Sequence, residues 1–381
     1  MRESTEFVEA AAALKPVLAR EQAAGDRDRR LTGEAMAAMR DAGMFRMFVP
    51  ESLGGSELGL RTSVDALAEL AYGDPSASWV VMILGAADLV VAQMAFEAQQ
   101  EIYADGPDTH VCVVLTPHAT AERVDGGWRM SGEWFPASGC LHSSWGVFGF
   151  PIEEGDAGVA AIPFSELRIK DTWHTVGMRA TGSNLVVGRD VFVPDHRVLR
   201  LRDAIAGPLG SGARFRSALL PTVLTYMIGP YLGMAEAALG HVMSKADKRP
   251  VSFTTYQRQS DSPAFQIAIA EASAKIDVAR LLAHSCASVI DDHALADTFP
   301  DYATRARHRL HVTHAVRQCG EALEMLVAAH GAAAVAESSP LSVLLRDMQT
   351  GLKHAMINPS WNLEACGRAL LGVEPNITPL L

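Results

Sequence analysis

The spacing of the apolar residues changes twice along this chain, and that change limits the folds it can adopt. Residues 1–106 repeat apolar side chains at helical intervals, as Met36 and Met39 illustrate. From residue 107 to 207 the pattern becomes short apolar runs separated by turn residues, which is typical of antiparallel strands. Helical spacing returns over residues 208–381. The sequence therefore predicts an α+β fold with three domains at these boundaries.

The last domain contains four long stretches of helical periodicity, which predict a four-helix bundle. They span residues 218–247, 262–292, 301–330 and 339–356, after a glycine-containing connection at 206–215. The loop between the first two stretches, residues 244–263, is long and polar. We therefore expect that loop to serve function or to contact another subunit.

Composition narrows the partners and the location. The net charge of −11 argues against nucleic acid, because phosphate binding needs concentrated Lys and Arg. The longest apolar run, residues 77–96, is interrupted by Asp88 and Gln93, so we interpret it as a buried helix and expect no membrane association. The five cysteines form no C-x-x-C pair, and the first residues lack a secretory pattern, so we expect a cytoplasmic protein.

One candidate site lies in the segment RDMQTGLKHAM, residues 346–356. Asp347 and His354 are seven residues apart, so on one helix they would share a face, about 10 Å apart along the axis. A carboxylate on that face can fix the tautomer of an imidazole, directly or through a neighbouring residue, and an imidazole can move protons near neutral pH. The chain has 13 histidines, however, and an ordinary helical histidine is the alternative interpretation.

Two turn-like motifs are also candidates. In FPASGCLHSSW, Ser138 offers a hydroxyl, and Gly139 lets the backbone approach a planar ring closely. In WHTVGMRATGSN, Trp173 offers a ring for stacking, and the segment 181–183 (TGS) forms a tight polar turn suited to a phosphate or a ring edge. Both motifs are equally compatible with ordinary turns between strands.

The sequence offers little for a metal or for a nicotinamide cofactor. No Glu-x-x-His is present, although a di-iron bundle requires that spacing, and the three histidines of HRLHVTH (308–314) have no acid between them. We therefore predict no metal site. The glycines form no G-x-G-x-x-G after a strand, so reduction of a bound cofactor would need electrons from another protein.

Taken in order, four stretches give the chain a family resemblance that covers nearly its whole length. They are AYGDPSASWVVM (71–82), VDGGWRMSGEWFPASGCLHSSW (124–145), WHTVGMRATGSNLVVGRDVFVP (173–194) and the segment from 339 to 372 that contains RDMQTGLKHAM. The sequence resembles the acyl-CoA dehydrogenase fold. Within that fold it is similar to the reduced-flavin monooxygenases that hydroxylate small aromatic molecules.

This resemblance implies roles for particular residues. Ser138 would hydrogen-bond to flavin N5, and His354, assisted by Asp347, would take a substrate proton or orient the peroxide, with His142 as a second pocket residue. The residues expected to bind the cofactor are Trp134, Ser138, Gly139, Trp173, Thr181, Gly182, Ser183, Arg346 and Arg368. Arg346 and Arg368 have an alternative role as structural partners of carboxylates.

The resemblance also implies the chemistry and the partners. Reduced FMN or FAD would react with O2 to form a C4a-hydroperoxide, which hydroxylates a small, aromatic substrate. A separate NAD(P)H:flavin reductase would supply the reduced flavin, and the protein would be a homotetramer. Phenols, indoles, polyketide aromatics and amino sugars all stay open as substrates.

One departure from the dehydrogenase pattern separates the alternatives. Many relatives carry the base for acyl-CoA dehydrogenation in a Tyr-Glu-Gly motif near the chain end, whereas this chain has KHAMINPSW there. No acid occurs between Asp347 and Glu364. Acyl-CoA dehydrogenation is therefore the second hypothesis, and a non-catalytic bundle protein is the third.

Overall fold

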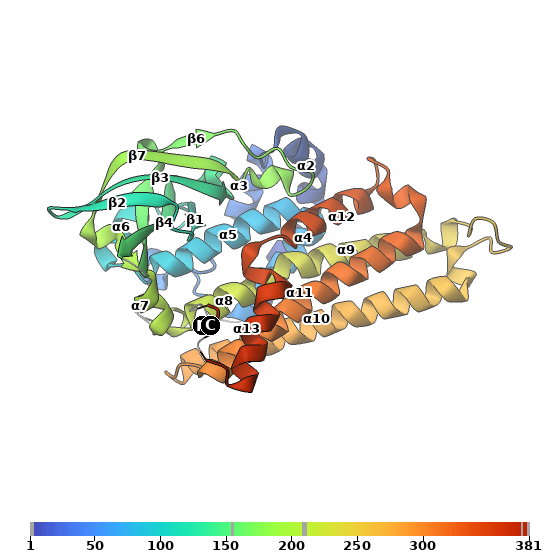
Figure 1. Ribbon diagram of the computed structural model, residues 1–381. Helices are drawn as coiled ribbons and strands as arrows, with labels where there is room; N and C mark the ends of the chain where they lie inside the picture. The colour runs from blue at the N-terminus through green and yellow to red at the C-terminus, as the bar shows by residue number, and fades with distance from the viewer. Residues whose placement is uncertain (1–3, 154–155, 208–211, 375, 379–381) are drawn as a thin grey trace.

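The computed structural model describes residues 4–153, 156–207, 212–374 and 376–378 (Figure 1). The predicted helical character of the N-terminal part is confirmed. Its helices are α1 (Thr5–Ala13), α2 (Lys15–Asp28), α3 (Gly33–Asp41), α4 (Leu60–Gly73), α5 (Pro75–Val91) and α6 (Phe96–Ile102).

Helix α5 runs through the middle of the molecule, and almost every residue in it is buried. It begins where Asp74 accepts a hydrogen bond from the Ser76 N–H at 2.9 Å and Pro75 occupies the first helical position. Inside it, Asp88 accepts a hydrogen bond from the Tyr103 hydroxyl at 2.7 Å. The predicted buried helix is thus confirmed, and none of the described helices is long and apolar enough to cross a membrane.

The middle part consists of two four-stranded sheets (Figure 1). One has the order β1-β4-β5-β8 and the other β2-β3-β7-β6, and every pair is antiparallel except β1 with β4. The strands are β1 (Val111–Val114), β2 (Ala119–Val124), β3 (Gly127–Ala137), β4 (Trp145–Glu153), β5 (Asp156–Pro163), β6 (Arg168–Lys170), β7 (Asn184–Pro194) and β8 (Val198–Arg200). The predicted antiparallel β part is confirmed, with one parallel pair added.

The C-terminal part is a bundle of α9 to α12, and its helices differ from the predicted ones in two places. The first stretch is divided at Met227, because Pro230 cannot donate to the carbonyl of Tyr226. The last stretch ends early, at Gly351, and a further helix follows it. The helices are α7 (Leu201–Ala206), α8 (Leu219–Tyr226), α9 (Ile228–Lys245), α10 (Pro263–Leu295), α11 (Tyr302–His330), α12 (Pro340–Gly351) and α13 (Pro359–Leu371). Part of the expected connection at 206–215, residues 208–211, lies outside the described residues.

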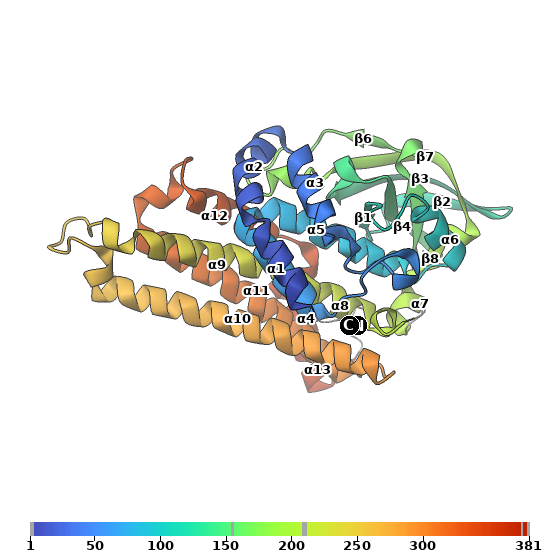
Figure 2. The ribbon, with the colours of Figure 1, turned by 180° about the vertical axis from the view of Figure 1, so that it is seen from behind.

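The three parts share one continuous hydrophobic core. Helix α5 contacts β1 on one side and α8 and α9 on another, while α4 packs along α9. Figure 2 shows α1, α2 and α3 covering one face, and the far ends of α9 and α10 extending away from the sheets. The β domain and the α12–α13 end of the chain therefore meet around α5.

Candidate functional site

Three buried hydroxyl groups form a chain of hydrogen bonds at the end of the β domain. Ser138 follows β3, and its Oγ lies 2.6 Å from the Oγ of Ser183. Ser183 Oγ lies 2.7 Å from Thr181 Oγ1, which donates to the Met178 carbonyl at 2.8 Å. The Gly139 N–H donates to the Thr181 carbonyl at 3.0 Å. The two predicted turn motifs are thus brought together as one unit.

The backbone of Met178 anchors this unit to the bundle. Its carbonyl also accepts from the Trp173 indole N–H at 2.9 Å, and its N–H donates to Asp347 Oδ1 on α12 at 2.6 Å. Met178 has a φ of 51°, and a Cβ added to the preceding Gly177 would lie 2.1 Å from the Arg346 carbonyl oxygen. Glycine is therefore required at that position for the turn to pack against α12.

Asp347 is almost fully buried, and burial raises the pKa of its carboxyl to about 7, against the opposing effect of the Met178 N–H. The nearby carboxylate of Asp74 raises that pKa further. No hydrogen bond joins Asp347 to His354 in the described part of the chain. Asp347 therefore holds the turn at Met178. Of the two expected routes to His354, the direct one is corrected, and an effect through a neighbouring residue stays a prediction.

The expectation that Asp347 and His354 share one helical face is also wrong. Helix α12 ends at Gly351, where the Tyr231 hydroxyl donates to the Gly351 carbonyl at 2.7 Å. The same carbonyl also accepts a hydrogen bond from the His354 N–H at 2.9 Å. It is therefore not available for the hydrogen bond that would extend the α-helix. His354 instead caps the short 3₁₀ turn Ala355–Ile357.

His354 is partly exposed, and its ring lies edge-on to Trp79 with centroids 5.8 Å apart. Burial lowers the pKa of this imidazole to about 4, so it is neutral at pH 7. Its Nδ1 accepts from the Met356 N–H at 3.3 Å, which places the remaining proton on Nε2. The side chain therefore presents an N–H donor.

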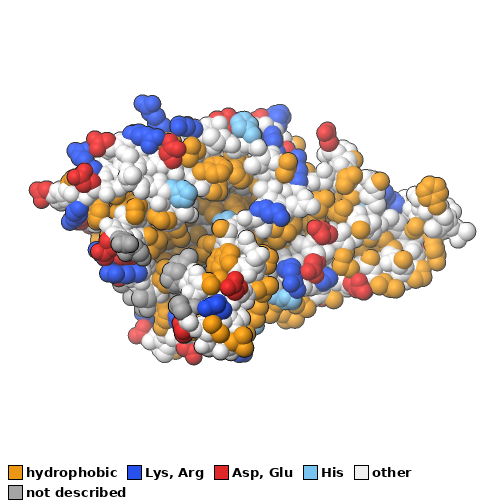
Figure 3. Space-filling view, viewed as in Figure 1, with side chains coloured by type: hydrophobic (Ala, Val, Ile, Leu, Met, Phe, Trp, Pro, Cys, Tyr) orange, Lys and Arg blue, Asp and Glu red, His pale blue; other side chains and the backbone are white. Residues whose placement is uncertain are grey.

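Helix α5 contacts both His354 and Gly139, the residue next to Ser138. Trp79 contacts the His354 ring, while the neighbouring Val80 and Leu84 pack against Gly139, next to Ser138. Sequence reasoning did not single out Trp79, because a tryptophan in an apolar run looks like any core residue. Figure 3 shows a hollow between the β domain and the α12–α13 end of the chain, and its walls carry mainly apolar side chains.

The structure places the ring of one predicted cofactor-binding residue in the protein core. Trp134 is fully buried between the two sheets, stacked on Phe148 with centroids 4.6 Å apart, and its indole donates to the Gly149 carbonyl at 2.8 Å. Its ring is thus a core group, which corrects the expectation of a cofactor contact. Arg346 pairs with Asp26 of α2 at 2.7 Å, in line with the structural alternative, and Arg368 lies on α13.

His142 lies in a pocket of about 470 Å³ beside α3. Burial, Arg30 and His110 lower the pKa of His142 to about 4. The pocket is lined by Arg30, Gly33, Met36, Ala37, Arg40, His110, Leu141, His142, Ser143 and Ser144. The lining of this pocket includes none of the three residues of the hydroxyl chain, and a role for His142 beside Ser138 stays a prediction.

Comparison with known proteins decides between the interpretations. Residues 3–106 match the model for the acyl-CoA dehydrogenase N-terminal domain, and residues 226–359 match that for the acyl-CoA dehydrogenase C-terminal domain. The oxygenase subunit HsaA of a flavin-dependent monooxygenase from Rhodococcus jostii is 33% identical over 364 residues, which are 91% of this chain and 93% of the relative. The chain belongs to the flavin-dependent monooxygenases of the acyl-CoA dehydrogenase fold.

Two further relatives agree with this family. The oxygenase component of an FADH2-dependent resorcinol hydroxylase from Rhizobium is 29% identical, with 91% of this chain and 89% of the relative covered. The solved structure of XiaF from Streptomyces, in complex with FADH2 and glycerol, has a TM-score of 0.93 and 33% identity, covering 99% of this chain and 97% of the other. Family membership favours oxygenation over the dehydrogenase hypothesis.

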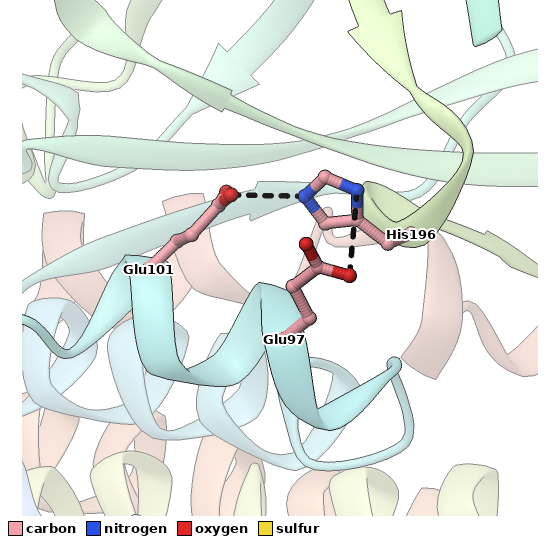
Figure 4. A group of neighbouring side chains, drawn as sticks. All are labelled: Glu97, Glu101 and His196. Atoms are coloured by element: carbon pink, nitrogen blue, oxygen red, sulfur yellow. Dashed lines mark hydrogen bonds and ion pairs between the residues drawn. The ribbon is translucent and has the colours of Figure 1, made fainter. Parts of the chain in front are cut away.

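One cluster of possible metal ligands occurs among the described residues, and it lies on α6 and the turn after β7. Figure 4 shows His196 between Glu97 and Glu101, with its Nε2 3.0 Å from Glu101 and its Nδ1 4.0 Å from Glu97. Glu101 also pairs with Arg197 at 2.5 Å. The arginine and histidine already satisfy this carboxylate, so the cluster ties α6 to the β domain.

Proposed function

We propose that this chain is the oxygenase component of a two-component system that hydroxylates a small aromatic substrate. The observation that carries the proposal is the buried hydroxyl chain that ends at Ser138. Helix α5 connects this chain with His354, because Trp79 contacts the His354 ring while Val80 and Leu84 lie against Gly139. A flavin ring needs a flat apolar slot with hydrogen-bonding groups at its edge, and these residues fit that need. Reduced FMN or FAD, when bound, supplies the activation of O2.

In this proposal the protein residues have separate tasks. Ser138 and the 181–183 turn hold the reactive edge of the ring, and Trp173 packs near it, next to the exposed ring of Phe135 at 5.9 Å. His354 donates through Nε2 to an oxygen atom of the substrate or the reacting group. The apolar walls exclude water, which would otherwise divert the oxidation to hydrogen peroxide.

The absence of a nicotinamide motif supports a separate NAD(P)H:flavin reductase as partner. The five described cysteines are all free and buried, which fits a cytoplasmic enzyme. The relatives' names include an oxygenase subunit and an oxygenase component, in agreement with a two-component system.

The direct test uses reduced flavin prepared without oxygen. The protein is mixed with reduced FMN or FAD, then with ¹⁸O2 and a panel of phenols and indoles, and products are analysed by mass spectrometry. One labelled oxygen atom in a hydroxylated product supports the proposal. Reduction of tightly bound oxidised FAD by an acyl-CoA, with no labelled product, would establish the dehydrogenase instead.

We also propose a homotetramer formed partly through α10. Apolar side chains recur along its outer surface at Ile267, Val278, Leu281 and Val289, with Leu281 69% exposed. Such a stripe is expected to be covered by another subunit. The fully exposed Phe253, in the polar loop between α9 and α10, is a second candidate contact.

Multi-angle light scattering tests the assembly. The unaltered chain is expected to elute as a tetramer, and Leu281→Arg is expected to shift it to smaller species while circular dichroism stays unchanged. The matched control is Glu271→Arg, an exposed charged position on the same helix. A monomer at micromolar concentration for the unaltered chain would contradict the proposal.

A further inference from the structure

The Met178 carbonyl at the end of the hydroxyl chain decides which hydroxyl donates in each of its hydrogen bonds. A carbonyl oxygen can only accept, so the Thr181 hydroxyl donates its single proton to the Met178 carbonyl, 2.8 Å away. The contact between Thr181 and Ser183, at 2.7 Å, must then use the proton of Ser183. The contact between Ser183 and Ser138, at 2.6 Å, must in turn use the proton of Ser138. Ser138 therefore has only lone pairs to offer to a ligand.

We propose that Thr181 and Ser183 are positioning residues that hold the Ser138 hydroxyl as a hydrogen-bond acceptor, so that the site selects flavin carrying a proton at N5. This inference rests on the proposed function, because it takes Ser138 as the neighbour of N5. Reduced flavin carries an N–H at that atom, which Ser138 can accept. Oxidised flavin carries a lone pair there, which would face the lone pairs of Ser138.

Burial and anchoring make this order of protons stable. Thr181 and Ser183 are each only 1% exposed, so bulk water does not compete for their hydroxyls. The Met178 carbonyl is held in place by two further donors, the Trp173 indole N–H at 2.9 Å and the Thr181 backbone N–H at 3.3 Å. The selection of the flavin redox state thus starts at the Met178 carbonyl and is transmitted to Ser138 through the hydroxyl groups of Thr181 and Ser183.

Removing either positioning hydroxyl should release a proton toward the ligand. In Thr181→Val, Ser183 loses its acceptor and can donate to Ser138, so the Ser138 proton becomes free to reach an oxidised N5. Ser183→Ala has the same result, because Ser138 loses its acceptor. In each variant we expect the ratio of dissociation constants, oxidised over reduced FMN, to fall about tenfold, the effect of one hydrogen bond.

The experiment is an anaerobic titration of the full-length protein with oxidised FMN and with photoreduced FMN, followed by fluorescence. Thr181→Ser keeps the hydroxyl and should restore the original ratio. Thr175→Val is the matched control, because that hydroxyl donates to the Gly177 carbonyl at 2.9 Å in the same loop but lies outside the chain. Oxidised 5-deaza-FMN has C–H in place of N5, so its affinity should not rise in any variant.

The outcomes separate this inference from the proposed function. If Ser138→Ala leaves the affinities for both flavins unchanged, Ser138 is not the neighbour of N5 and the proposed placement of the flavin fails. If Ser138→Ala weakens binding of reduced flavin while Thr181→Val and Ser183→Ala leave the ratio unchanged, the placement holds and the positioning role is overturned. A ratio that falls in Thr175→Val as much as in Thr181→Val would also overturn it, because the change would then reflect the loop as a whole.

Discussion

The two halves of the candidate site are built in opposite ways. On the β-domain side, Ser138, Ser183 and Thr181 are buried and bonded to one another, and the chain of contacts continues through Met178 to Asp347. On the α12–α13 side, His354 is a single, partly exposed imidazole between two helices, with one long contact to the adjacent backbone. The first half is preorganised, whereas the second can adjust to what it binds.

This difference suggests a division of labour. A buried network keeps its geometry and its protonation, which suits the recognition of a cofactor that is the same in every reaction cycle. A neutral histidine with a free N–H at a break between helices can follow substrates of different shape. Changes on the His354 side should therefore alter product formation, and changes on the Ser138 side should alter flavin binding.

The largest expected effect comes from His354→Ala. Product formation should fall about 10²- to 10⁴-fold, because a hydrogen-bond donor or proton carrier at the reacting atoms is lost. Flavin affinity should stay within about twofold, and the oxygen consumed should appear as hydrogen peroxide. Product and peroxide are measured together by chromatography and a peroxidase assay.

A control and a pH profile sharpen that test. His118→Ala removes an exposed histidine of the β domain and should leave product formation unchanged. Because the pKa of His354 is lowered to about 4, its contribution should be constant from pH 6 to 8 in the unaltered protein. A His354→Ala variant that hydroxylates at the original rate would make this histidine structural.

The next largest effect concerns Asp347, where stability should depend on pH. The pKa of this carboxyl is raised from 3.8 to about 7 in the folded protein, so the folded state binds the proton more tightly than the unfolded state does. The free energy of unfolding should therefore decrease by a few kcal/mol as the pH rises from 4 to 7. Asp347→Asn keeps an oxygen acceptor for Met178 and should lose much of this decrease.

Urea unfolding of both proteins at pH 5 and pH 8 measures this contribution. The difference in unfolding free energy, Asp347→Asn minus the unaltered protein, should be more positive at pH 8 than at pH 5. Asp74, whose pKa burial raises to about 6, contributes in the same direction, and because its carboxylate also raises the pKa of Asp347 the difference includes the coupling of the two carboxyls. An identical difference at the two pH values would show that Asp347 is already ionised in the folded state.

The sequence predicted the fold well because the signals for it are local. Strand alternation and helical periodicity are properties of short segments, and they placed the β part and the bundle correctly. The site was only partly predictable, because its contacts are long-range. Met178 and Asp347 are 169 residues apart, and no local pattern in either segment indicates the hydrogen bond between them.

Two cases show most clearly what the sequence could not predict. Trp134 and Trp173 stand in equally plausible motifs, yet only the pairing of the two sheets decides that Trp134 is enclosed between them. The end of α12 was missed because the Tyr231 hydroxyl, 120 residues earlier, bonds to the Gly351 carbonyl. In contrast, α13 begins with Asn358 and Pro359, a local start signal that sequence reasoning could have used.

The smallest expected effect tests the rigidity of the β-domain side itself. Trp173→Phe keeps an aromatic ring beside Phe135 but removes the indole N–H that donates to the Met178 carbonyl at 2.9 Å. Because Thr181 still donates to the same carbonyl, the proton order in the hydroxyl chain should survive. We expect a loss of about 1 kcal/mol in unfolding free energy, the usual contribution of one hydrogen bond, and no change in the ratio of oxidised to reduced flavin affinities. Denaturant unfolding and the anaerobic titration measure the two quantities on the same samples. If the affinity ratio fell as it should in Thr181→Val, the carbonyl would need both donors to stay in place, and the β-domain side would be less preorganised than its hydrogen bonds indicate.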